Sequence, residues 1–168
     1  MKRSQFIKTV GGSSLVLAAT PLLSFAHPQL NDPQLDKELV EIFVGKAHSD
    51  MGTVKELLAE HPTLLNAAHD WKFGDFETAL GAASHVGHKE LAQFLLDEGA
   101  QANIFTAALF GKLDIVKSMI AAFPSTLHVK GPHGFTLLHH AEKGGEEAIK
   151  VVEYLKGLGA TEGKINLY

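Results

Sequence analysis

The fold is decided by residues 78–100, which read TALGAASHVGHKELAQFLLDEGA. The stretch predicts two short helices separated by a turn at Gly87-His88. Thr78 suits the N-cap of the first helix, because its hydroxyl can accept a hydrogen bond from a free backbone N–H of the first turn. Gly99 suits the position just after the second helix, because glycine adopts the left-handed conformation there without steric cost. Residues 78–100 therefore predict a helix–turn–helix unit.

The second helix of this unit has further copies along the chain. They lie at residues 54–58, 91–96, 115–120 and 151–155. Their equivalent positions are Val54, Ala92, Val116 and Val152, so neighbouring copies are 38, 24 and 36 residues apart. One helix pair cannot cover its own apolar face, whereas stacked pairs cover one another. We therefore expect about four stacked helix–turn–helix repeats, with a second-helix core of Leu57, Leu58, Phe94, Leu95, Met119, Ile120, Tyr154 and Leu155.

The ends of the second helices follow an alternating pattern. Pro62 and Pro124 follow the odd copies, and Gly99 and Gly159 follow the even ones. Proline cannot continue a helix, and glycine favours its termination. The short spacing of 24 residues indicates that the loop before the third repeat is almost deleted. No segment alternates between apolar and polar residues with period two, so the prediction is an all-α fold without a sheet.

These repeats resemble the ankyrin repeat family. Residues 78–100 are similar to a nearly complete ankyrin helix pair, and residues 134–139, GFTLLH, are close to the family's Gly-x-Thr-Pro-Leu-His. Ala79 and Leu137 replace the family's proline, and Gly81 replaces its histidine. Residues 71–83, WKFGDFETALGAA, look like a string found in bacterial ankyrin proteins. The resemblance covers about residues 37–160 and implies an ankyrin solenoid that binds another protein through its concave face, made of hairpin tips and first helices.

Residues 1–26 have the pattern of an export signal. A basic start is followed by an apolar stretch and by small residues up to Ala26, which predicts cleavage after Ala26 and a periplasmic or secreted protein. Residues 3–8, RSQFIK, resemble a twin-arginine signal, but Ser4 stands where the second arginine belongs. The twin-arginine and Sec routes therefore both stay open. We expect a linker at residues 27–36, the repeat domain at 37–160 and a C-terminal tail at 161–168.

The charge balance excludes some partners. The chain has 15 basic and 19 acidic residues, for a formal net charge of −4. Loss of Lys2, Arg3 and Lys8 with the signal leaves 12 basic residues against 19 acidic ones, so the mature chain carries 12 − 19 = −7. An acidic surface argues against binding to nucleic acid or, after signal cleavage, to anionic membranes. The chain has no cysteine, which excludes disulfides, thiolate zinc sites and a cysteine nucleophile.

Two loops are the candidate protein-binding elements. The first is an enlarged hairpin near residues 70–78, and the second is the equivalent loop at 130–135. Aromatic side chains dominate binding hot spots because they bury a large area at small entropic cost. The alternative is that Trp71, Phe73 and Phe76 pack on neighbouring repeats. Asn103, Phe105 and Phe110 are expected to line a notch between the loops. The candidate binding residues are Trp71, Lys72, Phe73, Asp75, Phe76, Phe110, Pro132, His133 and Phe135.

Catalytic and metal sites are not expected. The chain has ten histidines, but His85 ends a predicted first helix, and His88 and His139 fall at positions that are structural in the ankyrin family. Ser84 and His85 are adjacent in a predicted helix, so their side chains point apart. Asp70, Asp75 and Glu77 are interpreted as solvated turn residues. The sequence therefore predicts no cofactor, no metal and no enzymatic activity.

The leading hypothesis is an exported ankyrin module that binds another protein of the bacterial envelope. An alternative is an immunity or inhibitor protein directed against a toxin or hydrolase, because an acidic chain suits a basic target. A third hypothesis, of another class, is a histidine-based metal binder or metalloenzyme. The sequence leaves the identity of the partner and the oligomeric state open.

Overall fold

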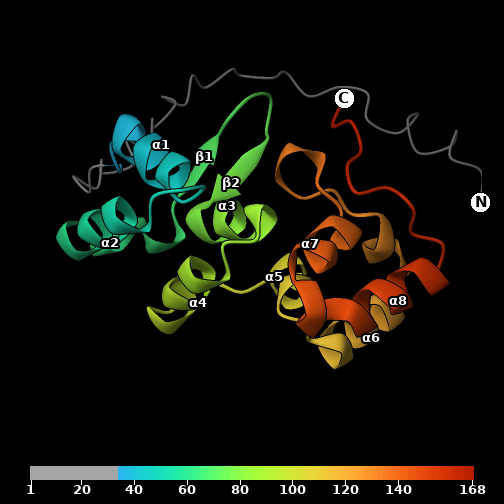
Figure 1. Ribbon diagram of the computed structural model, residues 1–168. Coiled ribbons are helices and arrows are strands. Elements are labelled where there is room, and N and C mark those ends of the chain that lie inside the picture. The colour runs from blue at the N-terminus through green and yellow to red at the C-terminus, as the bar shows by residue number, and fades with distance from the viewer. Residues whose placement is uncertain (1–33) are drawn as a thin grey trace, which may run out of the picture. The chain divides into compact units, whose positions relative to one another are not determined.

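The computed structural model describes residues 34–168, so the predicted signal at 1–26 lies outside the described residues (Figure 1). Within this range the α-helices form four consecutive pairs, which confirms the predicted all-α ankyrin-type fold. The pairs are α1 (Lys37–Lys46) with α2 (Met51–Glu60), α3 (Ala79–Val86) with α4 (Lys89–Asp97), α5 (Ile104–Leu109) with α6 (Leu113–Ala122), and α7 (Leu137–Lys143) with α8 (Ile149–Gly157). The first helices pack against one another in the order α1, α3, α5, α7.

Each first helix begins at a side-chain N-cap. The capping residues are Asp36, Thr78, Asn103 and Thr136, whose oxygens accept hydrogen bonds from backbone N–H groups of the first turn. The Thr78 hydroxyl lies 3.1 Å from the amide nitrogen of Gly81. Capping satisfies backbone donors that the helix itself cannot pair. The start of each first helix is therefore fixed by its cap, and the cap predicted at Thr78 is confirmed.

The second helices end in two ways, as predicted. A 3₁₀ turn follows α2 at Pro62–Asn66, and another follows α6 at Pro124–His128. In contrast, α4 and α8 are followed by Gly99 and Gly159, with φ values of 98° and 96°. These left-handed angles explain why glycine occupies both positions.

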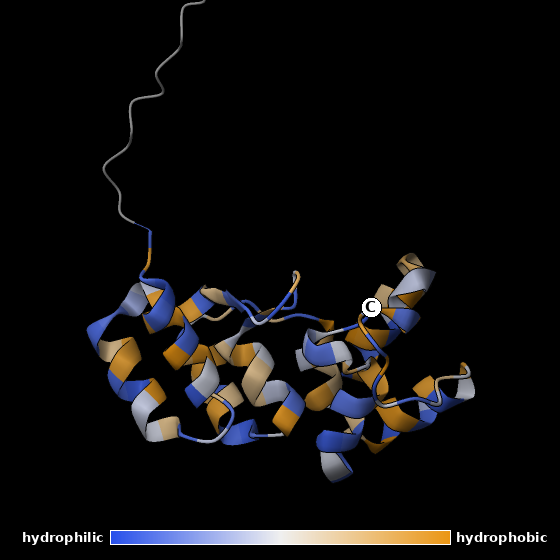
Figure 2. Cartoon of the chain, turned by 90° about the horizontal axis from the view of Figure 1, so that it is seen from above, coloured by the Kyte–Doolittle hydropathy of each residue, from blue (hydrophilic) through white to orange (hydrophobic). Residues whose placement is uncertain are grey.

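The hydrophobic core consists of two clusters. One is formed mainly by α1–α4 and the other by α5–α8, and Leu109 of α5 joins the first. Each helix carries both apolar and polar residues, as Figure 2 shows by colour. Half of the predicted second-helix core is buried, namely Leu58, Leu95, Ile120 and Leu155. The other half packs against the core while partly exposed, namely Leu57, Phe94, Met119 and Tyr154.

A short β-hairpin precedes α3 and corrects the prediction of no sheet. Strand β1 (Ala68–Asp70) pairs antiparallel with β2 (Phe76–Thr78), with Ala68 opposite Thr78. Each strand has only three residues, too few for an alternating pattern to be recognised in the sequence. We call residues 68–78 the first hairpin. It rises above α3 in Figure 1.

The loop at residues 130–135, which we call the second hairpin, is held by the C-terminal tail. Its own closing bond runs from the amide of Gly131 to the carbonyl of Phe135, at 2.8 Å. The Ile165 amide donates to the Gly134 carbonyl at 2.9 Å, and the Thr136 amide donates to the Gly163 carbonyl at 3.0 Å. The tail thus runs beside the second hairpin. Among residues 34–168 we find no helix with the length and apolar character that crossing a bilayer requires.

Candidate functional site

The first hairpin closes through its own hydrogen bonds. The Asp70 carboxylate accepts from the Gly74 amide at 2.9 Å, and the Trp71 amide donates to the Asp75 carbonyl at 3.1 Å. Phe73 and Gly74 have left-handed φ values of 52° and 87°. This turn fixes which of its aromatic side chains point outward.

The three aromatic residues of the first hairpin separate into two groups. Trp71 is half-buried and packs on the histidines beneath it, with its ring centroid 4.6 Å from that of His69. Its indole Nε1 donates to Glu77 Oε2 at 2.8 Å. Phe73 and Phe76 are 87 % and 62 % exposed. The alternative was that all three residues pack on neighbouring repeats. Only Trp71 does so.

The second hairpin is tied to the first through His133. Its amide and its Nδ1 both lie 2.8 Å from carboxylate oxygens of Asp75. Phe135 is stacked between the rings of His85 and His139, at centroid distances of 4.8 and 4.1 Å. The structure therefore brings Asp75, His133 and Phe135 together, but mainly in contacts within the chain.

The remaining candidate residues lie in different places. Pro132 is half-buried and borders the space between the two hairpins. Lys72 is exposed, and its carbonyl accepts a hydrogen bond from the Tyr168 hydroxyl at 2.6 Å. Phe110 packs against the first core cluster, with Lys89 Nζ 5.8 Å from its ring centroid, and it does not line that space.

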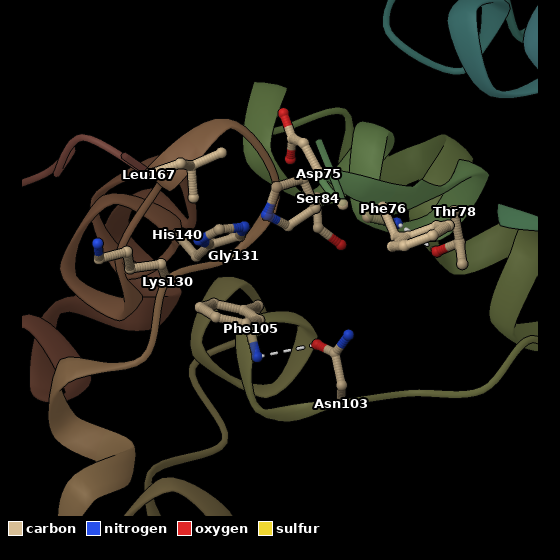
Figure 3. Close-up of a pocket in the computed structure, with 13 residues that line it drawn as sticks. Asp75, Phe76, Thr78, Ser84, Asn103, Phe105, Lys130, Gly131, His140 and Leu167 are labelled. Atoms are coloured by element: carbon tan, nitrogen blue, oxygen red, sulfur yellow. Dashed lines mark hydrogen bonds between the residues drawn. The ribbon is translucent and has the colours of Figure 1, made fainter. Parts of the chain in front are cut away.

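A pocket of about 330 Å³ lies between the two hairpins, and we call it the groove (Figure 3). Phe76 and Thr78 lie on one side of it, and Lys130, His140 and Leu167 lie on the other. The first helices α3, α5 and α7 contribute Ser84, Phe105 and His140. Asn103 and Phe105 line the groove, as the sequence predicted for a notch at this place.

Two buried polar atoms belong to residues that line the groove. Ser84 Oγ and His140 Nε2 have no hydrogen-bond partner among residues 34–168. Burial lowers the pKa of His140 to about 4, although the hydrogen bond with the Thr136 carbonyl opposes this shift. The ring is therefore neutral near pH 7. Its Nδ1 donates to that carbonyl at 2.8 Å, which leaves Nε2 as an acceptor.

A second polar group lies beneath the first hairpin, and we call it the His–Glu cluster. It consists of His48 between α1 and α2, Glu77 of β2, His85 of α3 and His133 of the second hairpin. One nitrogen or oxygen atom from each of the four lies within 4.8 Å of those of the others. Four segments from three repeats thus converge at one point.

Glu77 is the centre of this cluster, which corrects its interpretation as a solvated turn residue. It is 1 % exposed, while Asp70 is exposed and the Asp75 side chain is 9 % exposed. Burial favours a raised pKa, but the His85 ring 2.9 Å away, the Trp71 hydrogen bond and the nearby His48 ring outweigh it. The pKa of Glu77 therefore lies below its usual value, and its carboxylate is ionised near pH 7.

The comparison with protein families agrees with the architecture. Residues 75–107 match the family model described as Ankyrin repeat, and no curated protein is matched by the chain. Residues 75–107 therefore form an ankyrin repeat. The matched segment starts in the first hairpin, includes α3 and α4, and ends in α5. Ankyrin repeats mediate protein–protein interaction, so the match supports this general role.

The ankyrin resemblance also explains what the sequence did not reveal. It makes His85 the end of a first helix, and it gives no weight to His48 or Glu77. The convergence depends on the turn after α1 lying beside the last turn of α3, with a hairpin folded over both. The available signal for the cluster was that His48, His85 and His133 each lie near a predicted turn or hairpin.

Proposed function

We propose that this protein binds a segment of another protein in the groove between its two hairpins, without catalysis of its own. The observation that carries the proposal is the groove, about 330 Å³ in volume, on the face formed by first helices and hairpins. Exposed Phe76 stands at its rim, and Phe105 lies within it. A pocket with aromatic walls and a few fixed polar groups is typical of a binding site.

The chemistry of the groove suggests what would occupy it. An apolar side chain of the partner would contact Phe76 and Phe105. A donor beside it, such as a backbone N–H, would pair with His140 Nε2, and Ser84 Oγ can both donate and accept. Because an unpaired buried polar group is unfavourable, a partner that supplies these bonds gains affinity and specificity.

The cellular location is a further part of the proposal. We infer that the chain is exported and acts in the periplasm or outside the cell, on the strength of the signal-like pattern in residues 1–26. The test is mass spectrometry of the protein recovered from the envelope fraction of its host. An N-terminus at His27 supports export with cleavage after Ala26, and an intact N-terminus in the cytoplasmic fraction contradicts it.

The immunity or inhibitor role is a narrower version of the same function. The net charge of −7 for residues 27–168 favours it, because an acidic surface accelerates association with a basic target. A partner that is a basic toxin or hydrolase, and that loses activity when bound, would identify this role.

The binding experiment uses two exposed phenylalanines as a matched pair. A photo-crosslinking amino acid is placed at Phe76, or at Phe123, which is 64 % exposed and follows α6, away from the groove. The partner crosslinked through position 76 is purified and titrated against the unlabelled chain. We expect Phe76→Ala to weaken binding at least about tenfold, as for a hot-spot residue, and Phe123→Ala to leave it within twofold. Equal crosslinking at both positions, or unchanged affinity for Phe76→Ala, would contradict the proposal.

A further inference from the structure

The His–Glu cluster has a buried base and an accessible rim. The side chains of Glu77 and His85 are 0 % and 6 % exposed, whereas those of His48 and His133 are 27 % and 26 % exposed. A buried carboxylate requires compensation of its charge. The imidazoles around it compensate only when protonated, and several imidazolium ions in one place repel one another. The cluster therefore favours a different source of positive charge.

The tautomers of the two outer histidines are set by their surroundings. His48 Nδ1 lies 3.0 Å from the Gly45 carbonyl oxygen, and His133 Nδ1 lies 2.8 Å from Asp75 Oδ2. Carbonyl and carboxylate oxygens only accept hydrogen bonds, so each Nδ1 carries the proton. In the neutral rings, Nε2 then has a free lone pair. The Nε2 atoms of His48 and His133 lie 3.4 and 3.3 Å from Glu77 Oε2. All three atoms are then hydrogen-bond acceptors, so a cation among them would be needed to make these contacts favourable.

The third histidine, His85, also places a ring nitrogen close to the Glu77 carboxylate. His85 Nδ1 lies 2.9 Å from Glu77 Oε1, yet the two atoms are not in hydrogen-bonding geometry, and neither has a hydrogen-bond partner in the described part of the chain. Two ligands that are each 2.0–2.1 Å from a tetrahedral zinc ion lie about 3.3 Å apart. The separations of His48 Nε2 and His133 Nε2 from Glu77 Oε2, 3.4 and 3.3 Å, match this spacing, and His85 Nδ1 lies 2.9 Å from the other oxygen of the same carboxylate.

The set of donor atoms selects a class of metal. Three imidazole nitrogens and one carboxylate oxygen suit Zn²⁺ and the neighbouring divalent transition metals. Ca²⁺ and Mg²⁺ prefer sites made of oxygen atoms alone. Histidine ligands of metals usually donate their other N–H to a carboxylate or a backbone carbonyl. Asp75 accepts such a bond from His133, and the Gly45 carbonyl accepts one from His48.

We propose that His48, Glu77, His85 and His133 form a binding site for a divalent transition-metal ion with the coordination chemistry of Zn²⁺. Four protein ligands complete a tetrahedral shell, which is typical of structural zinc sites. The ligands come from the first, second and fourth repeats, so the ion would hold the second hairpin against the first. The proposal does not depend on what occupies the groove.

The test is a titration of the metal-free full chain with ZnCl₂ by calorimetry, with MgCl₂ and CaCl₂ in parallel. We expect one Zn²⁺ per chain and no saturable heat with the other two ions. His48→Gln and His133→Asn should each weaken Zn²⁺ binding at least about 100-fold. Asparagine is chosen at 133 because it tolerates the left-handed φ of 58° there. The control is His69→Gln, because His69 packs on Trp71 outside the cluster and its loss should change the affinity less than threefold.

Three results would overturn the proposal: no saturable Zn²⁺ binding, equal weakening by the control, or full affinity in the His48→Gln/His133→Asn double variant. If either variant loses its helical circular dichroism, imidazole ¹⁵N spectra of the unaltered chain decide the question. Zn²⁺ should then shift Nε2 of His48 and His133 and Nδ1 of His85, and leave His69 unchanged. Unchanged resonances of these three histidines would refute the site.

Discussion

The two hairpins differ in what determines their conformation. The first hairpin is closed by its own strand pairing and by the bond from the Gly74 amide to Asp70. The second has three backbone hydrogen bonds of its own, but it is also held by Ile165 of the tail and by Asp75 of the first hairpin. One wall of the groove is therefore locally determined, whereas the other depends on contacts that are distant in the sequence.

The largest difference is expected between Gly134→Ala and Gly74→Ala. Both glycines have left-handed φ values, 79° and 87°, which disfavour a Cβ by about 1–2 kcal/mol. A Cβ at Gly134 would also overlap the carbonyl of Ile165, whereas a Cβ at Gly74 has no atom within 4 Å. We expect Gly134→Ala to lower the free energy of unfolding in urea by about 3–4 kcal/mol, and Gly74→Ala by about 1 kcal/mol. Equal losses would show that the tail does not hold the second hairpin.

Acid should first destabilise the part of the fold around His140, which lies on the second hairpin's side of the groove. The folded pKa of His140, about 4, lies below its unfolded value of about 6.5, so the unfolded chain binds more protons between these values. Stability must therefore fall as the pH drops from 6.5 to 4, by up to about 3 kcal/mol from this group. Urea unfolding across this range should show a smaller loss for His140→Asn, whose amide can keep the bond to Thr136. An identical pH profile for the variant would contradict the assignment.

The bond between the hairpins should contribute more than the bond inside the first one. Asp75→Asn alters two hydrogen bonds to His133, one of them to the ring, and Asp70→Asn alters one exposed bond. In the presence of a chelator we expect losses of about 2 and about 1 kcal/mol, respectively, in urea unfolding. A double-mutant cycle of Asp75 with His133 should show coupling, and additive effects would mean that the contact contributes nothing.

The smallest effect is expected at the tip of the first hairpin. Phe73 is 87 % exposed, and its ring centroid lies 5.7 Å from that of Tyr168. Phe73→Ala should change the free energy of unfolding by less than about 0.5 kcal/mol. A larger loss, measured by the same urea titration, would mean that the tip of the first hairpin is packed rather than free to meet a partner.

The sequence predicted what depends on local pattern and repetition. The four helix pairs, the threonine caps and the alternation of proline with glycine at helix ends each follow from residues close together in the chain. The location of the notch lined by Asn103 and Phe105 followed from one short spacing between repeats. These features need no knowledge of how distant segments meet.

The rest depends on long-range packing. Glu77 is an acidic residue beside a turn, and only the fold of three repeats over it explains why it is buried. The tail at residues 161–168 has no periodic pattern, and its role arises from backbone bonds to Gly134 and Thr136. His48 and His133 are separated by almost the whole repeat domain, so their meeting at Glu77 could not be inferred from spacing.

Hydrogen–deuterium exchange of the full chain tests whether the groove is the binding site. Exchange is measured for the chain alone and for the chain saturated with the purified partner that was identified by crosslinking. We expect slower exchange in residues 74–84, 103–106 and 130–135, which include the second half of the first hairpin, the second hairpin, and parts of α3 and α5 at the base of the groove. Protection confined to α6 and α8, with these three segments unchanged, would place the partner elsewhere and contradict the account.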